Sequence, residues 1–484
     1  MSASREKKTR QERGADYLSP KQQRALEEQK ANRRSTAIFT VCAVAFVLAL
    51  AAMILWNTNI IQRKAAAVRV NGETYTAADV AYYYYNGRMN LLSDSSYGID
   101  SSTSLREQTY TDGTQSWYDY LSNAAVETLT NTVLTARAAE AAGFSLPADS
   151  EAQVSSTLDS LASSAALYNY STAQYLKALY GPLMTYDVFE RNLRADALAE
   201  AYTASLADVS GYSEDELTAQ YDADPDAGDL VRFEYAIFYA AADESNTNDP
   251  DGTAAAKEAA ESLQRQVKAG AGFAETAASL GADSVAATYG YASAGEYSEW
   301  LFDDARRDGD MTVLDYSNID YTTYSIVTGS WVLLFHEKER ADFHTVDVRH
   351  ILIQSAAMPD AEAEAQAQDV LAQYLAGDRT EEAFAALAQE YSDDNADDGG
   401  LYEGVYRGQM VAPFEDWCFD ASRQSGDTGV VETEYGYHVM YFVGRSNYAY
   451  WQELAASALA TERTAAITAD AQVEQLSGMK YIDR

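Results

Sequence analysis

WCFDASRQSGD (residues 417–427) repeats WLFDDARRDGD (residues 300–310) without a gap in the alignment. Both stretches open with an aromatic pair and close with Gly-Asp. The shared positions are Trp300/Trp417, Phe302/Phe419, Asp303/Asp420, Arg306/Arg423, Gly309/Gly426 and Asp310/Asp427. Two copies of one domain are the simplest account of such internal repetition.

The repeat extends outward from this pair of stretches in both directions. The corresponding segments are 272–281 with 383–392, 329–335 with 436–442, and 232–239 with 347–354. Each copy reads strand, long helix, short helix, loop, helix, strand, strand, which predicts a small antiparallel sheet with packed helices. We therefore expect α+β domains in tandem, at residues 229–340 and 344–446.

Apolar spacing in the second copy predicts which helical side chains face the sheet. On the long helix we expect this face to hold Val370, Leu371, Tyr374 and Leu375. The last helix has its own apolar stripe, formed by Phe414, Trp417 and Cys418.

The N-terminal part of the chain predicts a membrane anchor. Residues 37–56 (AIFTVCAVAFVLALAAMILW) contain no charge, and twenty helical residues span about 30 Å, one hydrocarbon core. Arg33 and Arg34 precede them, so residues 1–36 are expected to be a cytoplasmic basic tail and the body to be extracytoplasmic. A cleaved signal peptide and a buried core helix are the alternatives. The run is long for a signal core, and no clean small-x-small cleavage site follows it.

Charge and cysteine content exclude some partners and bonds for this chain. The 484-residue chain has a formal net charge of −39, although residues 1–34 hold ten basic against five acidic side chains. An acidic body repels nucleic acid, so we expect no nucleic-acid partner. Cys42 lies in the predicted membrane helix and Cys418 lies outside it, which predicts no intrachain disulfide.

Residues 65–225 predict a helical module between the anchor and the repeat. Residues 67–76 read as a strand with an Asn-Gly turn, and long stretches with helical periodicity follow. Residues 82–85 are four consecutive tyrosines, which suit either core packing or a surface that binds unfolded chains; core packing is favoured. Residues 450–476 read as a helix within a C-terminal segment, 447–484.

The second copy resembles the parvulin-type (PpiC-type) peptidyl-prolyl isomerases over residues 349–442. The motifs that carry the resemblance are RHILI (349–353), FAALAQEYSDD (384–394), GG (399–400), GQMVAPFED (408–416) and GDTGVVETEYGYHVMYF (426–442). The order of anchor, helical module, two copies and terminal helix is similar to the extracytoplasmic foldases of the PrsA and SurA type. That resemblance implies a SurA-N-like chaperone module, onto which the C-terminal segment packs back.

The parvulin resemblance also implies a set of site residues. His350 on the first strand and His438 on the last strand are expected to lie together, facing Asp394, as the catalytic group. Met410 and Phe414 match the apolar pocket for the proline ring, with Gln409 at its edge. Tyr435 stands where several members carry serine or threonine. No metal and no cofactor are implied.

These residue types suit catalysis of rotation about an X–Pro bond. The barrier is about 20 kcal/mol because a twisted amide loses resonance, and no bond is made or broken. Two alternatives remain for the histidine pair: a purely structural contact between two strands, and a metal site made of two histidines and a carboxylate. The other histidines, His336 and His344, read as exposed linker residues.

The first copy lacks the histidines. Tyr235 stands at the His350 position and Trp331 at the His438 position, which predicts a degenerate, catalytically silent copy. The sequence therefore predicts an anchored isomerase and folding chaperone, whose partners are unfolded or nascent secreted or cell-surface polypeptides that contain proline. The alternatives are a holdase with inactive parvulin domains and a metal-dependent hydrolase.

Overall fold

The computed structural model describes residues 39–50, 53, 59–93, 95–100, 102–111, 113–241, 251–293, 295–320, 325–356 and 358–483. They fall into two compact units. One unit runs to Tyr202 and includes Ala465–Arg484, and the other runs from Thr203 to Thr464. The predicted cytoplasmic tail, residues 1–36, lies outside the described residues.

Residues 39–50 of the predicted membrane anchor are helical. Among the described residues, no helix reaches the length and apolarity that crossing a bilayer requires. The rest of the predicted span, apart from Met53, lies outside the described residues. The anchor therefore stays a prediction.

The first unit is a helical module with one small sheet. Its helices are α3 (Ile60–Arg63), α4 (Ala77–Ser93), α5 (Trp117–Ala141), α6 (Ala148–Leu167), α7 (Thr172–Tyr180) and α8 (Tyr186–Leu206), with 3-10 turns η1 (Ser95–Tyr97) and η5 (Ser477–Tyr481). Its antiparallel strands, in the order β11-β1-β2, are β1 (Ala66–Val70), β2 (Glu73–Thr76) and β11 (Val473–Gln475). The helical character and the Asn-Gly turn at residues 71–72 agree with the sequence.

The consecutive tyrosines of α4 belong to the core of this unit. Tyr82, Tyr83, Tyr84 and Tyr85 are between 2% and 8% exposed. The Tyr83 hydroxyl donates a hydrogen bond to Asp196 at 2.9 Å. Core packing is therefore confirmed for these four side chains.

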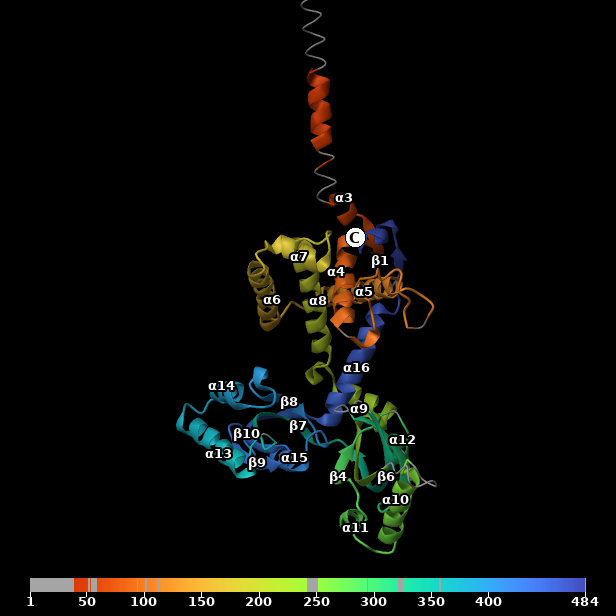
Figure 1. Cartoon of the computed structure of the whole chain (residues 1–484), viewed down its shortest axis with the longest axis vertical. Coiled ribbons are helices and arrows are strands. Elements are labelled where there is room, and N and C mark those ends of the chain that lie inside the picture. The colour runs from red at the N-terminus through yellow and green to blue at the C-terminus, as the bar shows by residue number, and fades with distance from the viewer. Residues whose placement is uncertain are drawn as a thin grey trace, which may run out of the picture. The chain divides into compact units, whose positions relative to one another are not determined.

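The C-terminal segment returns to the start of the unit, as expected. Strand β11 pairs with β1, and Figure 1 shows the C-terminus beside β1. Ile482 is fully buried in the same core as β1. The helix predicted over residues 450–476 is shorter, because α16 (Tyr450–Thr468) ends before the residues that pair with β1.

The second unit holds both copies of the repeat. It begins with η2 (Val209–Gly211), α9 (Glu214–Ala223) and η3 (Pro225–Gly228). The first copy contains β3 (Asp229–Tyr239), α10 (Thr253–Lys268), α11 (Phe273–Ser279), β4 (Ser284–Gly290), α12 (Glu296–Phe302), β5 (Met311–Asp320) and β6 (Ser325–Arg340). The second contains β7 (His344–Gln354), α13 (Asp360–Ala376), α14 (Glu381–Tyr391), η4 (Ala396–Asp398), β8 (Leu401–Val405), α15 (Ala412–Phe419), β9 (Thr428–Thr433) and β10 (Gly436–Ala449).

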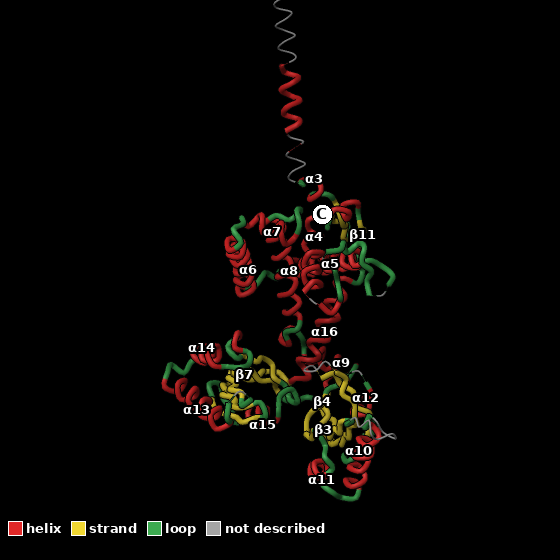
Figure 2. Tube along the Cα trace, in the orientation of Figure 1, coloured by secondary structure: helices red, strands yellow, loops and turns green. Residues whose placement is uncertain are grey.

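The two copies have the same sheet topology. The antiparallel strand orders are β4-β3-β6-β5 and β8-β7-β10-β9, so each strand of one copy has a counterpart in the other. Figure 2 shows helices against the strands of each copy. The predicted α+β class is confirmed for both.

In the second copy, helices cover both faces of the sheet. Ile351 and Ile353 pack with α13 and α14, whereas Val346 and Val348 pack with Phe414 and Cys418 of α15. Side chains alternate between faces along a strand, so even-numbered residues near the middle of β7 point toward α15. This alternation places His350 on the α15 face.

The identical residues of the repeat make matching contacts. The Arg306 guanidinium lies over the Trp300 ring at 4.7 Å from its centroid, and Arg423 lies over Trp417 at 4.3 Å. In both copies the arginine thereby covers the tryptophan on the short helix before the last hairpin.

The closing Gly-Asp of each motif holds the start of that hairpin. The Gly309 amide donates to the Phe335 carbonyl at 3.0 Å, and the Gly426 amide donates to the Phe442 carbonyl at 2.9 Å. The repetition in sequence therefore reflects a repeated backbone hydrogen bond.

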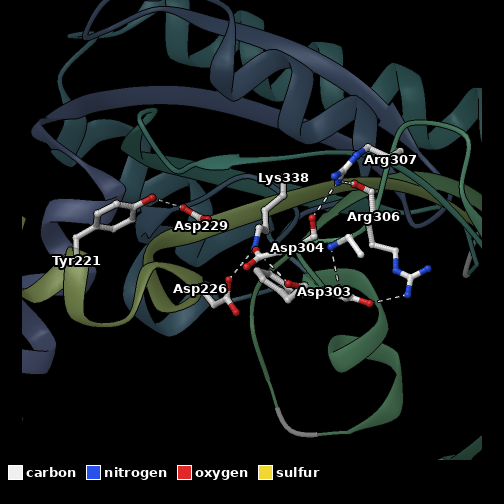
Figure 3. A network of polar contacts seen from close by, with 10 residues as sticks. Tyr221, Asp226, Asp229, Asp303, Asp304, Arg306, Arg307 and Lys338 are labelled. Carbon is white, nitrogen blue, oxygen red and sulfur yellow. Dashed lines mark hydrogen bonds and ion pairs between the residues drawn. The ribbon is translucent and has the colours of Figure 1, made fainter.

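A further polar network in the first copy surrounds Lys338 of β6 (Figure 3). Its ammonium donates to Asp226 at 2.9 Å and to Asp304 at 2.6 Å, while the Tyr221 hydroxyl donates to Asp229 at 2.6 Å. These contacts join α9, η3, the α12–β5 loop and β6. They fix the point at which the chain enters the first sheet.

The prediction that His336 and His344 are exposed linker residues is wrong. His336 lies in β6, where its Nε2 is 3.0 Å from Glu234 and its Nδ1 is 3.2 Å from Asp308. His344 begins β7, and its Nδ1 is 2.9 Å from the Ser446 carbonyl. Strand β6 ends at Arg340 and β7 begins at His344, so the junction between the two copies consists of strand ends.

Candidate active site

The two predicted site histidines lie on neighbouring central strands. His350 of β7 pairs with Met440, and His438 of β10 pairs with Leu352, so the histidines are diagonal neighbours on the α15 face. Their Nδ1 atoms are 3.0 Å apart and their rings are nearly parallel, at 18°. The exposed fractions are 2% for His350 and 5% for His438.

Asp394 reaches the pair from the loop after α14. Its Oδ2 lies 3.3 Å from His350 Nε2, a buried nitrogen that has no hydrogen-bond partner in the described part of the chain. Ser392 fixes this loop: its hydroxyl donates to the Asp394 carbonyl at 2.6 Å and accepts from the Leu352 amide at 3.1 Å. The structure therefore brings the predicted group of His350, His438 and Asp394 together.

Burial keeps both imidazoles neutral at pH 7. It lowers the pKa of His350, against the opposing charge of Asp394. Burial, and then the neighbouring His350, lower the pKa of His438 to about 4. Each ring then carries one N–H, so the Nδ1–Nδ1 contact joins one donor to one acceptor.

The Asp394 carboxylate determines which ring nitrogens of His350 and His438 carry the protons. A carboxylate accepts but does not donate hydrogen bonds, so Asp394 favours the tautomer with a proton on His350 Nε2. His350 Nδ1 then accepts from His438 Nδ1–H, and His438 Nε2 accepts from the Thr433 hydroxyl, 2.8 Å away. The Thr433 and His438 donors therefore run in the direction of Asp394, whose Oδ2 lies 3.3 Å from His350 Nε2 without forming a hydrogen bond with it.

Thr433 and Tyr402 are site residues that the sequence analysis missed. Thr433 ends β9 beside the hairpin turn, and its place two residues before Tyr435 was the available signal. The Tyr402 hydroxyl donates to Asp394 Oδ2 at 3.0 Å, and its ring centroid lies 5.1 Å from that of His350. Burial and this hydrogen bond raise the pKa of Tyr402 to about 12, so it remains a donor.

The predicted pocket residues divide into a buried and an exposed set. Phe414 is 3% exposed, and its ring centroid lies 5.4 Å from the centroids of both histidine rings. Met410 is half-buried against the same apolar cluster, whereas Gln409 is exposed. Tyr435 is 57% exposed, and Thr433 supplies the hydroxyl next to His438.

A cleft of about 810 Å³ opens beside this group, between the two copies. Gln409, Met410 and Thr433 line it on one side, and β4 with Tyr235 lines it on the other. His350, His438, Asp394 and Phe414 are not among its lining residues. The histidine pair is therefore a buried support behind the wall of the cleft, connected to it through Thr433.

The geometry does not suit metal binding by the histidine pair. The two Nδ1 atoms face each other at hydrogen-bond distance, so each is already occupied by the other ring. In the described part of the chain, no group of three or more histidine, cysteine or acidic side chains is arranged to hold a metal ion.

The first copy places two aromatic side chains at the equivalent positions. Tyr235 pairs with Leu333, and Trp331 pairs with Ile237, the same diagonal arrangement as His350 and His438. The Tyr235 and Trp331 ring centroids are 6.1 Å apart. The correspondence inferred from the sequence is confirmed by strand register.

Comparison with known proteins identifies the second copy. Residues 332–445 match the family model of the PPIC-type PPIase domain. The chain is 43% identical over 98 residues to Chaperone SurA of Chromohalobacter salexigens, and 31% identical over 103 residues to Foldase protein PrsA 1 of Listeria innocua. The second copy is a parvulin-type peptidyl-prolyl isomerase domain, which confirms the resemblance found in its motifs.

These similarities cover a limited part of each protein. The SurA alignment spans 19% of this chain and 21% of the relative, and the PrsA alignment spans 21% and 31%. A crystal structure of the peptidylprolyl isomerase PrsA from Bacillus anthracis aligns with 20% identity over 30% of this chain and 58% of that chain, with a TM-score of 0.20. The match thus spans less than a third of the length of either curated relative.

Proposed function

We propose that this chain, with its parvulin-type domain, is a peptidyl-prolyl cis-trans isomerase and folding chaperone. The observation that carries the proposal is the arrangement of Thr433, His438, His350 and Asp394 behind a wall that includes Met410. Such a site catalyses without a covalent intermediate. It needs only to bind the twisted X–Pro amide more tightly than either planar form.

Each residue has a role that follows from its position. Met410 offers half-buried apolar surface to the proline ring and excludes water, which favours the less polar twisted amide. Phe414 packs against both histidines and holds them beneath this wall. His438 accepts a hydrogen bond from the Thr433 hydroxyl and thereby fixes the Thr433 side chain, which lines the cleft. Gln409 and Tyr435 are exposed nearby and are proposed contacts for the residues that flank proline.

The proposed setting is the outer face of a cell membrane. An uncharged segment at residues 37–56, preceded by Arg33 and Arg34, supports a single-pass anchor with a cytoplasmic N-terminus. The proposed partners are unfolded or nascent secreted and cell-surface polypeptides that contain proline. The helical first unit would serve as the chaperone module, and the first copy would be catalytically silent.

A holdase without isomerase activity is the second candidate. The depth of the histidine pair favours it, because neither imidazole lines the cleft. In that case the pair would stabilise the sheet, and the chain would bind polypeptides without changing the rate of X–Pro rotation.

A proline-containing tetrapeptide assay on the detergent-solubilised chain tests the proposal. Met410→Ala should lower kcat/KM about tenfold. The half-buried Met410 side chain is expected to contribute about 1.4 kcal/mol to binding of the twisted amide. Met311→Ala is the matched control, because Met311 is a half-buried methionine of the first copy. Activity in the wild type that Met410→Ala leaves unchanged would contradict the proposed site, and a wild type without activity would favour the holdase.

A further inference from the structure

The loop that carries Gln409 and Met410 rests directly on the first copy. Gly408 has a φ of +84°, and a Cβ at this position would lie 2.7 Å from the Tyr289 carbonyl oxygen in β4. Only glycine allows both this backbone conformation and this close approach. The loop of the second copy is therefore fitted to the edge strand of the first copy.

Tyr291, the residue after β4, is bonded to the same loop. Its hydroxyl donates a 2.7 Å hydrogen bond to the Arg407 carbonyl. Its ring meets the rings of Tyr406 and Tyr450 edge to face, at centroid distances of 5.2 and 5.7 Å. Tyr406 and Tyr450 are themselves stacked at 5.2 Å, so Tyr291 closes a cluster of three tyrosines.

The opposite side of the loop is held by the second copy itself. The buried Glu415 of α15 accepts a 2.5 Å hydrogen bond from the Gly408 amide. The Gln409 amide donates to the Tyr406 carbonyl at 3.3 Å, and the Gln409 side chain accepts from the Tyr406 amide at 3.1 Å. The loop thus has two supports, one from each copy.

We propose that Tyr291 of the silent copy is a positioning residue for the proline-binding wall of the second copy. The hydrogen bond to Arg407 fixes the loop three residues before Met410, and β4 forms the opposite wall of the same cleft of about 810 Å³. The silent copy is then a structural part of the isomerase site. This inference rests on the proposed isomerase function.

Kinetics and loop opening report on this role separately. Removing the Tyr291 hydroxyl costs about one hydrogen bond, roughly 1 kcal/mol, which corresponds to about a fivefold change in an equilibrium constant. The proline ring is the same in the planar and the twisted amide, so a displaced Met410 loses ring contacts in both forms while its side chain still excludes water. The loss therefore falls mainly on KM, which should rise about fivefold, while kcat changes little.

The test compares Tyr291→Phe with Tyr297→Phe in the full chain. Tyr297 is a partly buried tyrosine of α12 in the same copy, packed against Phe233 and Trp331. Tyr291→Phe keeps the ring and should raise KM for the proline tetrapeptide, and it should speed hydrogen exchange of the amides of residues 408–411. Tyr297→Phe should change neither quantity.

Two results would overturn the inference. One is unchanged exchange of residues 408–411 in Tyr291→Phe. The other is a faster exchange with an unchanged KM, which would make Tyr291 merely structural. If the wild type has no isomerase activity, the proposed function fails. The exchange measurement then still decides whether Tyr291 holds the loop.

Discussion

The buried histidine pair predicts that the second copy loses stability as the pH falls from 7.5 to 5. His438 is 5% exposed, and burial together with His350 lowers its pKa from about 6.5 to about 4. In the unfolded chain the ring regains its ordinary pKa, so the unfolded state takes up a proton that the folded state does not. The contribution of neutral His438 to the stability of the second copy is therefore fully present above pH 6.5 and is lost as the pH falls toward 4.

The magnitude follows from the difference between the two pKa values. The complete difference corresponds to about 3 kcal/mol. At pH 5 the unfolded ring is almost fully protonated and the folded ring is still mostly neutral, so about 2 kcal/mol is lost relative to pH 7.5. Burial lowers the pKa of His350 as well, which adds to the loss in the same direction.

Hydrogen exchange of β10 measures this loss within the second copy alone. The free energy of opening, corrected for the intrinsic pH dependence of exchange, should fall by about 2 kcal/mol or more in the wild type. His438→Gln should lose most of this pH dependence. Phe414→Leu is the control, because it removes packing beside both histidines without removing a titratable group. An equal pH dependence in the wild type and His438→Gln would show that His438 is not the group whose protonation destabilises the second copy.

Two other substitutions test the surroundings of the site. Gly400→Ala should destabilise the second copy by more than about 1 kcal/mol in thermal unfolding, because Gly400 has a φ of +70° and a Cβ would lie 2.0 Å from the His350 carbonyl oxygen; an unchanged melting temperature would contradict this. Burial raises the pKa of the Cys418 thiol to about 12, so in a Cys42→Ser chain a thiol reagent at pH 8 should label Cys418 only after unfolding; rapid labelling of the folded chain would contradict its burial.

Much of the fold could be predicted because the sequence repeats it. The Trp-to-Asp motif occurs twice, and its Arg–Trp contact and its glycine amide hydrogen bond recur in both copies. The parvulin resemblance implied that His350 and His438 lie together, and the strand register places them as diagonal neighbours. Local patterns and repetition were sufficient for these features.

Contacts between neighbouring elements were not predicted. Thr433 reaches His438 across the hairpin turn, and Tyr402 of β8 reaches Asp394, although each pair is close in sequence. His336 looked like a linker residue because its partners, Glu234 and Asp308, lie in other elements. The prediction that Leu375 faces the sheet is wrong: it fits the apolar spacing of α13 but is 40% exposed.

The strand near the end of the chain was also not predicted, because its pairing partner lies far away in sequence. Residues 469–476 continue a helical composition, yet Val473–Gln475 form strand β11 because β1 offers an unpaired edge. The contact of the first copy with the second was also not predicted. Its missing histidines indicated a silent domain, whereas its contact with the Gln409–Met410 loop became visible only in the structure.

NMR exchange spectroscopy on an X–Pro peptide, with the full chain at catalytic concentration, distinguishes an isomerase from a holdase. With the wild type, cis–trans exchange should be faster than in buffer, and Met410→Ala should reduce this acceleration about tenfold. A peptide that binds but exchanges at the rate seen in buffer would show that the chain is a holdase.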